Sequence, residues 1–381
     1  MRQKIDPNLC DNLKKYGTGD WNECFHCGNC TALCPLTENG SLFPRKEIRL
    51  LQIGLKDELV SSVEPWLCYY CGDCSKTCPR DANPGELMMS LRRYLTSLYD
   101  WTGIARKIYT SKFFEIAAII IIAIGVLLLY TRYTIFPSGD ASAWIGNDGG
   151  VLINSFASWK TIHIGDWAMA ALLAFLLISN VFNMWLKIIV KDKSIKIPFT
   201  AYITEIFSLI WNFFTQKKLK KCDDSKSYWV IHLFLMLSYV MLFTMIVGFL
   251  EWFQTDTVHP VWHPQRLLGY ISTIGLFVGV VYFSVNRFKK NKENGKYSHF
   301  TDWTFLILLF VTTLSGILLH FFRVYGHPIA TYVTYLIHLM VLVPMLMIEV
   351  PFSKWSHLAY RPVAIYFANL KKAAKKEKII L

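Results

Sequence analysis

The chain has 381 residues, of which 53% are hydrophobic. This composition is too apolar for an ordinary soluble protein of the same length and indicates a polytopic membrane protein. The net charge of +13 does not indicate a nucleic-acid-binding protein, because the Lys and Arg residues gather in short segments that flank apolar runs.

Two cysteine runs near the N-terminus repeat one pattern, C-x2-C-x2-C-x3-C-P, at residues 24–35 (CFHCGNCTALCP) and 68–79 (CYYCGDCSKTCP). This spacing is the bacterial 4Fe-4S signature, in which the fourth Cys of each run binds the cluster of the other run. The sequence therefore predicts two 4Fe-4S clusters. The predicted ligands are Cys24, Cys27, Cys30 and Cys78 for cluster 1, and Cys68, Cys71, Cys74 and Cys34 for cluster 2.

Structural zinc and a disulfide framework are the alternatives for these cysteines. A zinc site usually takes two Cys from one segment and two from another, at wider spacing. A disulfide framework suits a small secreted domain, whereas we expect no secretory signal in the first residues, MRQKIDPN. The two cysteines outside the runs, Cys10 and Cys222, are predicted to be incidental thiols.

Helical spacing of apolar residues marks the segments that follow the cysteine runs. Ile48, Leu51 and Leu55 recur in this way after Pro44, and residues 84–101 repeat the arrangement. We therefore predict an all-α, helical ferredoxin-like domain over residues 1–110 rather than the βαββαβ ferredoxin fold. Its aromatic residues are predicted either to shield the clusters or to form plain core: Trp21, Phe25, Trp66, Tyr69 and Tyr70.

Six apolar segments are long enough to cross a bilayer as helices. They lie at about residues 113–130, 166–190, 228–250, 266–286, 303–322 and 330–352. We assign residues 111–360 to a six-helix transmembrane cytochrome b domain and residues 361–381 to a basic cytoplasmic tail. A further apolar segment, residues 199–214, is short and is predicted to be an interfacial helix.

The distribution of basic residues supports this number of spans. With six spans and the cluster domain inside, the Lys-rich loops at 187–196, 217–221 and 287–292 face the cytoplasm together with the C-terminus. A seventh span at 199–214 would place the later basic loops outside, against the positive-inside rule. The sequence thus predicts a multi-pass protein of the cytoplasmic (inner) membrane, with the N-terminal domain and the C-terminus in the cytoplasm.

Three histidines lie in or beside the predicted spans, namely His232, His338 and His357. Ionisable groups in a bilayer are costly and imidazole is the usual haem ligand, so we interpret all three as ligands of haem b; hydrogen-bonded core histidines are the alternative. His338 and His357 are about 28 Å apart along a continuous helix and cannot bind the same haem. They indicate two haems, and His232 lies at the right depth to pair with His357.

The partner of His338 at the outer haem stays open. The favoured candidate is His263, which opens the fourth span, and His320 is the next. The other histidines near this face are His163, His259 and His327. In the last span, we expect a bulge at Pro344 or Pro351 to bring His357 onto the haem-binding face.

A quinone site requires polar groups at the depth of the membrane surface. The candidates near the outer face are His320, Arg323, Glu251 and His259. Glu349 and Lys354 are the candidates near the inner face. The alternative role of each is interfacial anchoring or helix capping.

The cysteine runs resemble those of the C subunit of heterodisulfide reductases. The segment HLMVLVPMLMIEVPFSKWSH resembles the cytochrome b membrane subunits of heterodisulfide reductase and of respiratory nitrate reductase, its gamma chain. The fusion of both parts resembles QmoC, the membrane subunit of quinone-interacting membrane-bound oxidoreductases. This resemblance implies two haems b between the third and sixth spans, with His232 and His357 at the inner one. Where the gamma chain has a second histidine this chain has Leu242, and His263 is the predicted substitute.

Motifs and resemblance together predict a membrane electron-transfer subunit. It would relay electrons between the quinone pool (menaquinone), two haems b and two 4Fe-4S clusters to soluble flavin and iron–sulfur subunits that resemble QmoA and QmoB, toward adenylylsulfate reductase in dissimilatory sulfur metabolism. The sequence contains no G-x-G-x-x-G element and no paired Cys-Cys-Gly motif, so we expect the soluble substrate to react on another subunit. The alternatives are a membrane arm of a heterodisulfide or thiol–disulfide reductase, and a non-redox anchor or sensor.

Overall fold

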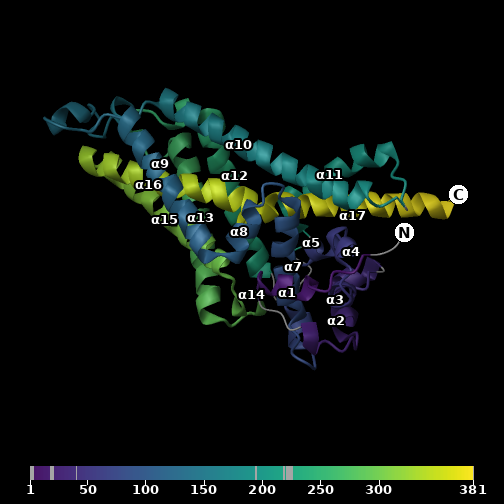
Figure 1. The fold of residues 1–381 in the computed structure, drawn as a ribbon. Coiled ribbons are helices and arrows are strands. Elements are labelled where there is room, and N and C mark those ends of the chain that lie inside the picture. The colour runs from purple at the N-terminus through teal and green to yellow at the C-terminus, as the bar shows by residue number, and fades with distance from the viewer. Residues whose placement is uncertain are drawn as a thin grey trace.

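The computed structural model describes residues 4–17, 21–39, 41–193, 195–217, 219 and 226–380. These residues form helices and turns and contain no β-strand, only an isolated bridge between Ile145 and Val151. The all-α prediction is therefore confirmed. A domain of short helices lies beside one end of a bundle of long helices (Figure 1).

The N-terminal domain is built around helix α7. Its helices are α1 (Leu9–Lys14), α2 (Asn29–Leu33), α3 (Arg45–Gln52), α4 (Lys56–Val60), α5 (Glu64–Leu67), α6 (Asp73–Lys76), α7 (Pro84–Tyr99) and α8 (Ile104–Thr110), with 3-10 turns at Trp21–Glu23 and Pro35–Asn39. Leu87, Leu91 and Leu95 of α7 are spaced at one helical turn each and are all buried. They pack in one core with Ile48 and Trp66.

Six helices of the described residues are long and apolar enough to cross a membrane. They are α9 (Lys112–Tyr133), α10 (Trp159–Trp185, prolonged by a π-helical turn over Leu186–Val190), α12 (Lys226–Phe253), α13 (Pro264–Lys289), α15 (Phe300–Val324) and α16 (Pro328–Phe352). The six predicted segments are confirmed. Large apolar side chains stay exposed on the outside of the bundle, as expected for a surface in contact with lipid, for example Ile121, Phe175 and Ile307.

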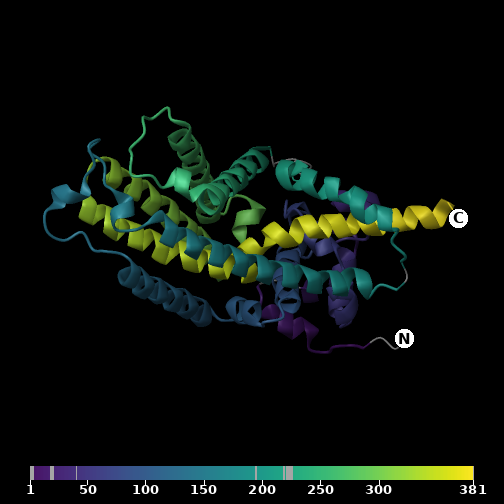
Figure 2. The same cartoon turned by 90° about the horizontal axis from the view of Figure 1, so that it is seen from above.

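Two further helices extend from the bundle beside the N-terminal domain. Helix α17 (His357–Ile380) prolongs the line of α16, and α11 (Phe199–Thr215) lies along it (Figures 1 and 2). The phenol of Tyr366 donates to the carbonyl of Tyr202 at 2.8 Å, and the Asn369 amide donates to Glu205 and Ser208. The segment predicted as an interfacial helix is thus a helix, and its location in lipid stays a prediction.

The N-terminal domain packs against the bundle through α10 and α17. Ile188 of α10 and Tyr360 of α17 belong to the same apolar core as the domain itself. The ring of Tyr360 lies 5.1 Å from that of Trp66, centroid to centroid. We call this end of the bundle the domain end and the opposite end the far end. Of the predicted domain boundaries, residue 110 falls just before α9 and residue 360 falls inside α17.

Candidate functional site

The two cysteine runs fold in the same way. In each run a loop carries the first two cysteines and a short helix, α2 or α6, carries the third, with Gly28 or Gly72 in a left-handed conformation just before the helix (φ 90° and 88°). Glycine suits these positions because it has no Cβ to clash in that conformation. Helices α2 and α6 pack against each other, so the cysteine after each helix lies close to the other run.

The predicted ligands of cluster 1 come together in this arrangement. One small cavity is lined by Cys24, Cys27, Cys30 and Cys78. Burial raises the pKa of the Cys30 thiol, and the nearby thiolates of the other three cysteines act in the same direction. Cys27 is exposed whereas Cys30 is buried, so this set of cysteines reaches the surface of the domain at Cys27.

The predicted ligands of cluster 2 form a second set across the two runs. Burial raises the pKa of Cys34 to about 12, and the thiolates of Cys68 and Cys71 act on it in the same direction. Burial also raises the pKa of Cys74, which has the other three cysteines as charged neighbours. The thiolate is the form that binds metal, so thiols that burial keeps protonated ionise when cations bind beside them.

Both sets fit a cluster better than a single metal ion. In the described part of the chain, no group of three or more His, Cys, Asp or Glu side chains lies close enough to hold one ion. The four thiolates of a 4Fe-4S cluster bind four different irons and are therefore spread around the cluster. Two sets of four cysteines have the ligand type and number for two clusters, and the ligand assignment stays a prediction that this geometry supports.

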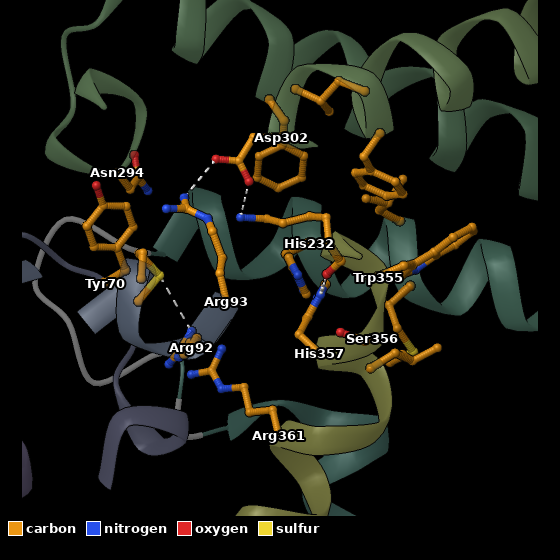
Figure 3. Close-up of a pocket in the computed structure, with 18 of the residues that line it drawn as sticks. Tyr70, Arg92, Arg93, His232, Asn294, Asp302, Trp355, Ser356, His357 and Arg361 are labelled. Carbon is orange, nitrogen blue, oxygen red and sulfur yellow. Dashed lines mark hydrogen bonds and ion pairs between the residues drawn. The ribbon is translucent and has the colours of Figure 1, made fainter. Parts of the chain in front are cut away.

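A cavity of about 200 Å³ lies between the N-terminal domain and the domain end of the bundle (Figure 3). The domain contributes Tyr69 and Tyr70, which lie between cysteines of the second run, and Arg92 of α7. The bundle contributes His232 of α12, and α17 contributes its first residue, His357. The cavity thus connects the second cysteine run to two of the predicted haem ligands.

His232 and His357 lie side by side in this cavity (Figure 3). Their ring centroids are 6.3 Å apart, and the ring planes are inclined by 54°. Two imidazoles that bind one metal ion from opposite sides, each at about 2 Å, have their ring centroids roughly 6 Å apart. The separation of the two rings therefore fits one ion held between them.

Hydrogen bonds fix which nitrogen of each ring is free. Nδ1 of His357 donates to the carbonyl of Lys354 at 2.6 Å, and Nδ1 of His232 bonds the amide oxygen of Gln216 at 2.7 Å. Because these oxygens only accept, each Nδ1 carries the proton and each Nε2 keeps a free lone pair. Burial lowers the pKa of His357 to about 3, which keeps this imidazole neutral. Ligating histidines are held in this way.

A second, smaller cavity borders the same pair of histidines. It is lined by residues of α11 and α17, among them Phe213 and Ile365, and by Tyr69. Space therefore flanks the pair on two sides, as a planar macrocycle between the two rings requires. On the side of the larger cavity, Arg92 and Arg361 provide positive charge beside this space.

A break in the last span brings His357 to this position. Helix α16 contains Pro344 and Pro351 and ends at Phe352, Ser353 has non-helical backbone angles (φ −125°, ψ −146°), and α17 begins at His357 after a 3-10 turn. Instead of the expected bulge inside one helix, the chain thus starts a new helix at the predicted ligand, His357.

Arg92 connects the cavity to the second cysteine run. Its guanidinium donates to the carbonyls of Pro65 at 2.6 Å and Trp66 at 3.3 Å, and also to the carbonyl of Cys68. Burial lowers the pKa of Arg92 to about 10. The residue fixes the loop that carries Cys68 against the wall of the cavity, a role that its position in the sequence did not indicate.

Asp302 is the centre of a buried charge network at the same end, which sequence reasoning missed. Its carboxylate pairs with Arg93 of α7 at 3.2 Å, with Arg287 of α13 at 3.5 Å and with Lys354. Arg93 also pairs with Glu86 at 3.1 Å. The only signal in the sequence is an Asp at the start of an apolar span, where a charge is costly unless it is paired.

At the far end, the predicted partners of His338 are not gathered around it. Nδ1 of His338 bonds the hydroxyl of Ser315 at 2.9 Å, and among the described residues no ring contact joins His338 to another histidine. His263 instead stacks on His259, with ring centroids 3.9 Å apart. Nε2 of His320 bonds the phenol of Tyr270 at 2.9 Å. The outer haem and its ligands stay a prediction.

The other quinone-site candidates are also at the far end. The guanidinium of Arg323 donates to the carbonyls of Thr255 and Thr257, and Glu251 lies exposed in the last turn of α12. Arg323 thus holds the loop after α12 through backbone contacts. Of the two candidates at the domain end, Lys354 lines the cavity beside His357 and Glu349 is fully buried. The quinone site stays a prediction.

The similarities to known proteins that follow include the N-terminal domain. Residues 20–82 match the family model of the 4Fe-4S dicluster domain. A protein of Archaeoglobus profundus that is similar to the heterodisulfide reductase C subunit is 33% identical over 97 residues, which make up 25% of this chain and 52% of that protein. The C subunit of an H(2):CoB-CoM heterodisulfide,ferredoxin reductase of Methanothermobacter thermautotrophicus is 37% identical over 63 residues, 16% of this chain and 34% of the relative.

The iron-sulfur C subunit of a CoB–CoM heterodisulfide reductase of Methanopyrus kandleri is 43% identical over 44 residues, 12% of this chain and 23% of the relative. The chain thus spans about half the length of the first of these relatives and less of the other two. No solved structure matches the chain significantly. Residues 20–82 are thus similar to a 4Fe-4S dicluster domain, this part of the chain is similar to the C subunit of heterodisulfide reductases, and six helices of membrane-spanning length follow it.

Proposed function

We propose that the chain is the membrane electron-transfer subunit of a quinone-linked oxidoreductase. It relays electrons between the quinone pool, two haems b and two 4Fe-4S clusters, and passes them to soluble flavin and iron–sulfur subunits. The observation that carries the proposal is the His232–His357 pair, because it lies in a cavity shared with the second cysteine run. The dicluster match supports the iron–sulfur half of this pathway.

The inner haem is held by His232 and His357 through their Nε2 atoms. A haem bound by two imidazoles transfers single electrons without binding a substrate. Gln216 and Lys354 orient the two rings through Nδ1. Arg361 lines both cavities beside the pair and is the cation best placed for a haem carboxylate.

The positions of the two cysteine sets support an order for the iron–sulfur clusters. Tyr69 and Tyr70 belong to the loop between Cys68 and Cys71 and also line the haem cavity, so cluster 2 is the one nearer the bundle. Cluster 1 reaches the surface at Cys27. We therefore assign cluster 2 to the exchange with the inner haem, and cluster 1 to the exchange with a soluble subunit.

The surface beside cluster 1 has the character of a docking site. The ring of Phe25, next to Cys24, is 69% exposed, and the Arg80 guanidinium lies over it at 4.4 Å. An exposed aromatic ring with an arginine is typical of residues that anchor protein partners. In this proposal, the flavin and iron–sulfur subunits that bind here resemble QmoA and QmoB. The final partner is adenylylsulfate reductase, and the quinone is menaquinone.

A count of bound cofactors tests the proposal directly. We expect the purified full-length chain to contain about two haems b and about eight non-haem irons, seen in a reduced-minus-oxidised spectrum with haem and iron quantified. His232→Ala and His357→Ala should each remove about half of the haem and leave the iron content unchanged, because the clusters do not depend on these residues.

His299→Asn is the matched control for these variants. His299 is a half-buried histidine at the same end of the bundle that caps α15, and Asn retains the capping function. The control should keep all of the haem. Absence of haem from the wild-type chain that contains its clusters would overturn the proposal and leave an iron–sulfur anchor or sensor.

The membrane arm of a heterodisulfide or thiol–disulfide reductase is the second candidate. The names of the relatives favour it, because all three are heterodisulfide reductase subunits or similar to one. It uses the same cofactors with another soluble partner. Purification of the intact complex, followed by assay of quinol-dependent reduction of a heterodisulfide and of adenylylsulfate reductase, separates the two candidates.

A further inference from the structure

Two fully buried carboxyl groups lie at the domain end of the bundle and have no part in the pathway described above. Glu349 is in the last turns of α16 and Glu115 is in the first turn of α9, and their exposed fractions are 0% and 1%. Helices α9 and α16 pack against each other, and the two carboxyl groups interact electrostatically. The pair therefore occupies one site.

Each carboxyl group has one oxygen that is paired and one that is not. Oε2 of Glu115 accepts from the hydroxyl of Thr304 at 3.1 Å, and Oε2 of Glu349 accepts from the backbone N–H of Lys354 at 3.2 Å. Oε1 of each residue has no hydrogen-bond partner among the described residues. Two carboxylates in one buried site repel each other and cannot both remain ionised, so such a pair binds a proton.

Lys354 joins this pair to the histidine site. Its carbonyl accepts the hydrogen bond from Nδ1 of His357, and its N–H donates to Glu349. A single residue thus contacts both a proposed haem ligand and the buried carboxyl group. Charges in a buried region of low dielectric constant are weakly screened, so a change of charge at the histidine site is expected to act on Glu349 across this one residue.

The other charged and titratable groups around Glu349 come from four elements. They are Glu115 of α9, Asp302 of α15, Tyr109 of α8 and Lys354 of the 3-10 turn. Asp302 is surrounded by cations, Arg93, Arg287 and Lys354, so its own charge is compensated.

Helix α10 also packs against α16, but its charged residues lie elsewhere. Asp166 interacts with Tyr335 in the half of the bundle toward the far end, and Lys187 donates to the carbonyl of Leu98. Of the buried carboxyl groups at the domain end, the pair Glu115 and Glu349 thus lacks a full set of compensating partners.

We propose that Glu115 and Glu349 form a proton-binding site that is linked to reduction of the His232–His357 site. One electron, delivered by a quinol or by a chemical reductant, enters the histidine site, and one proton from water converts a carboxylate of the pair into a carboxylic acid. The added negative charge is thereby balanced inside the protein. This inference rests on the haem site proposed above.

The test is a redox titration of the haem in the purified full-length chain at several pH values. In the wild type, the midpoint potential of the haem bound by His232 and His357 should fall as the pH rises, because each electron is taken up with a proton. In Glu349→Gln, which cannot bind the proton there, this dependence should be lost. Asp140→Asn removes an exposed carboxyl group in the loop after α9, at the far end, and should leave the dependence unchanged.

A second readout follows the proton itself. The infrared difference spectrum between the reduced and oxidised protein should show the C=O stretch of a protonated carboxylic acid, and Glu349→Gln should remove it. If Glu349→Gln does not fold, Glu115→Gln is titrated in its place and should weaken the same dependence.

The outcomes separate this inference from the proposed function. A chain without haem overturns the haem site and, with it, this inference. A chain with haem whose midpoint potential depends on pH equally in the wild type, in Glu349→Gln and in Glu115→Gln overturns the inference alone. A wild-type potential that does not change with pH does so too.

Discussion

At the scale of single residues, the proposed exchange of one ligand between the two cysteine runs would link the two runs of the N-terminal domain. Cys78 lies with the first run and Cys34 with the second. In the proposed assignment each cluster takes one thiolate from the other run, so neither run completes its site alone. Metal binding is then coupled to folding of the whole domain, since ligands from distant segments must come together.

Cys78→Ser tests this exchange. It removes one ligand of cluster 1 and leaves the four cysteines of cluster 2 complete, so we expect the iron content to fall from about eight to about four per chain. Cys10→Ser is the control, because Cys10 is a thiol outside both sets that donates to the carbonyl of Leu51. Full iron content in Cys78→Ser would contradict the assignment of Cys78 as a ligand.

At the scale of elements, α11 supports the histidine site as well as presenting an apolar surface. The helix is fixed to α17 by polar contacts, and its large apolar residues, such as Phe207 and Trp211, are exposed. The residue after its last turn, Gln216, has a left-handed backbone (φ 45°) and bonds His232. The position of α11 on α17 therefore determines the orientation of a proposed haem ligand on α12.

Gln216→Leu separates this role from the apolar surface. Loss of the acceptor for Nδ1 of His232 should weaken haem binding by about 10–100-fold, as is typical of residues that orient a ligating histidine. The measurement is the rate of haem transfer to an excess of apomyoglobin. Gln216→Glu keeps an acceptor oxygen and should bind haem nearly as tightly as the wild type. Equal haem loss from both variants would show that the contact does not orient His232.

At the scale of the whole molecule, the sequence predicts the features that depend on a local pattern of residues. It does not predict the features that depend on how distant segments of the chain pack together. The six helices of membrane-spanning length follow from the length of apolar runs, and the similarity to a dicluster domain follows from cysteine spacing. The Asp302 network was not predictable, because Arg93 lies 209 residues away in the chain.

Which aromatic side chains are exposed to solvent was also not predictable from the type of residue alone. Phe25 was expected to shield a cluster or to lie in the core, but it is 69% exposed. Likewise, the helix break before His357 occurs at Ser353, two residues after the second proline, where no turn motif marks it. These features depend on how the N-terminal domain packs against the bundle.

Asp302 is the residue whose loss should loosen this packing most. In Asp302→Asn the buried Arg93 and the partly buried Arg287 and Lys354 lose their common carboxylate. Breaking a buried ion pair from one side costs about 3–5 kcal/mol of the free energy of unfolding. The expected result is a lower melting temperature in detergent and faster proteolysis between α7 and α9. Asp57→Asn removes the exposed pair of Asp57 with Lys191, which also joins the two parts, and should cost less than about 1 kcal/mol. Equal stability of the two variants would mean that the apolar contact of Trp66 with Tyr360, rather than the charge network, holds the N-terminal domain on the bundle.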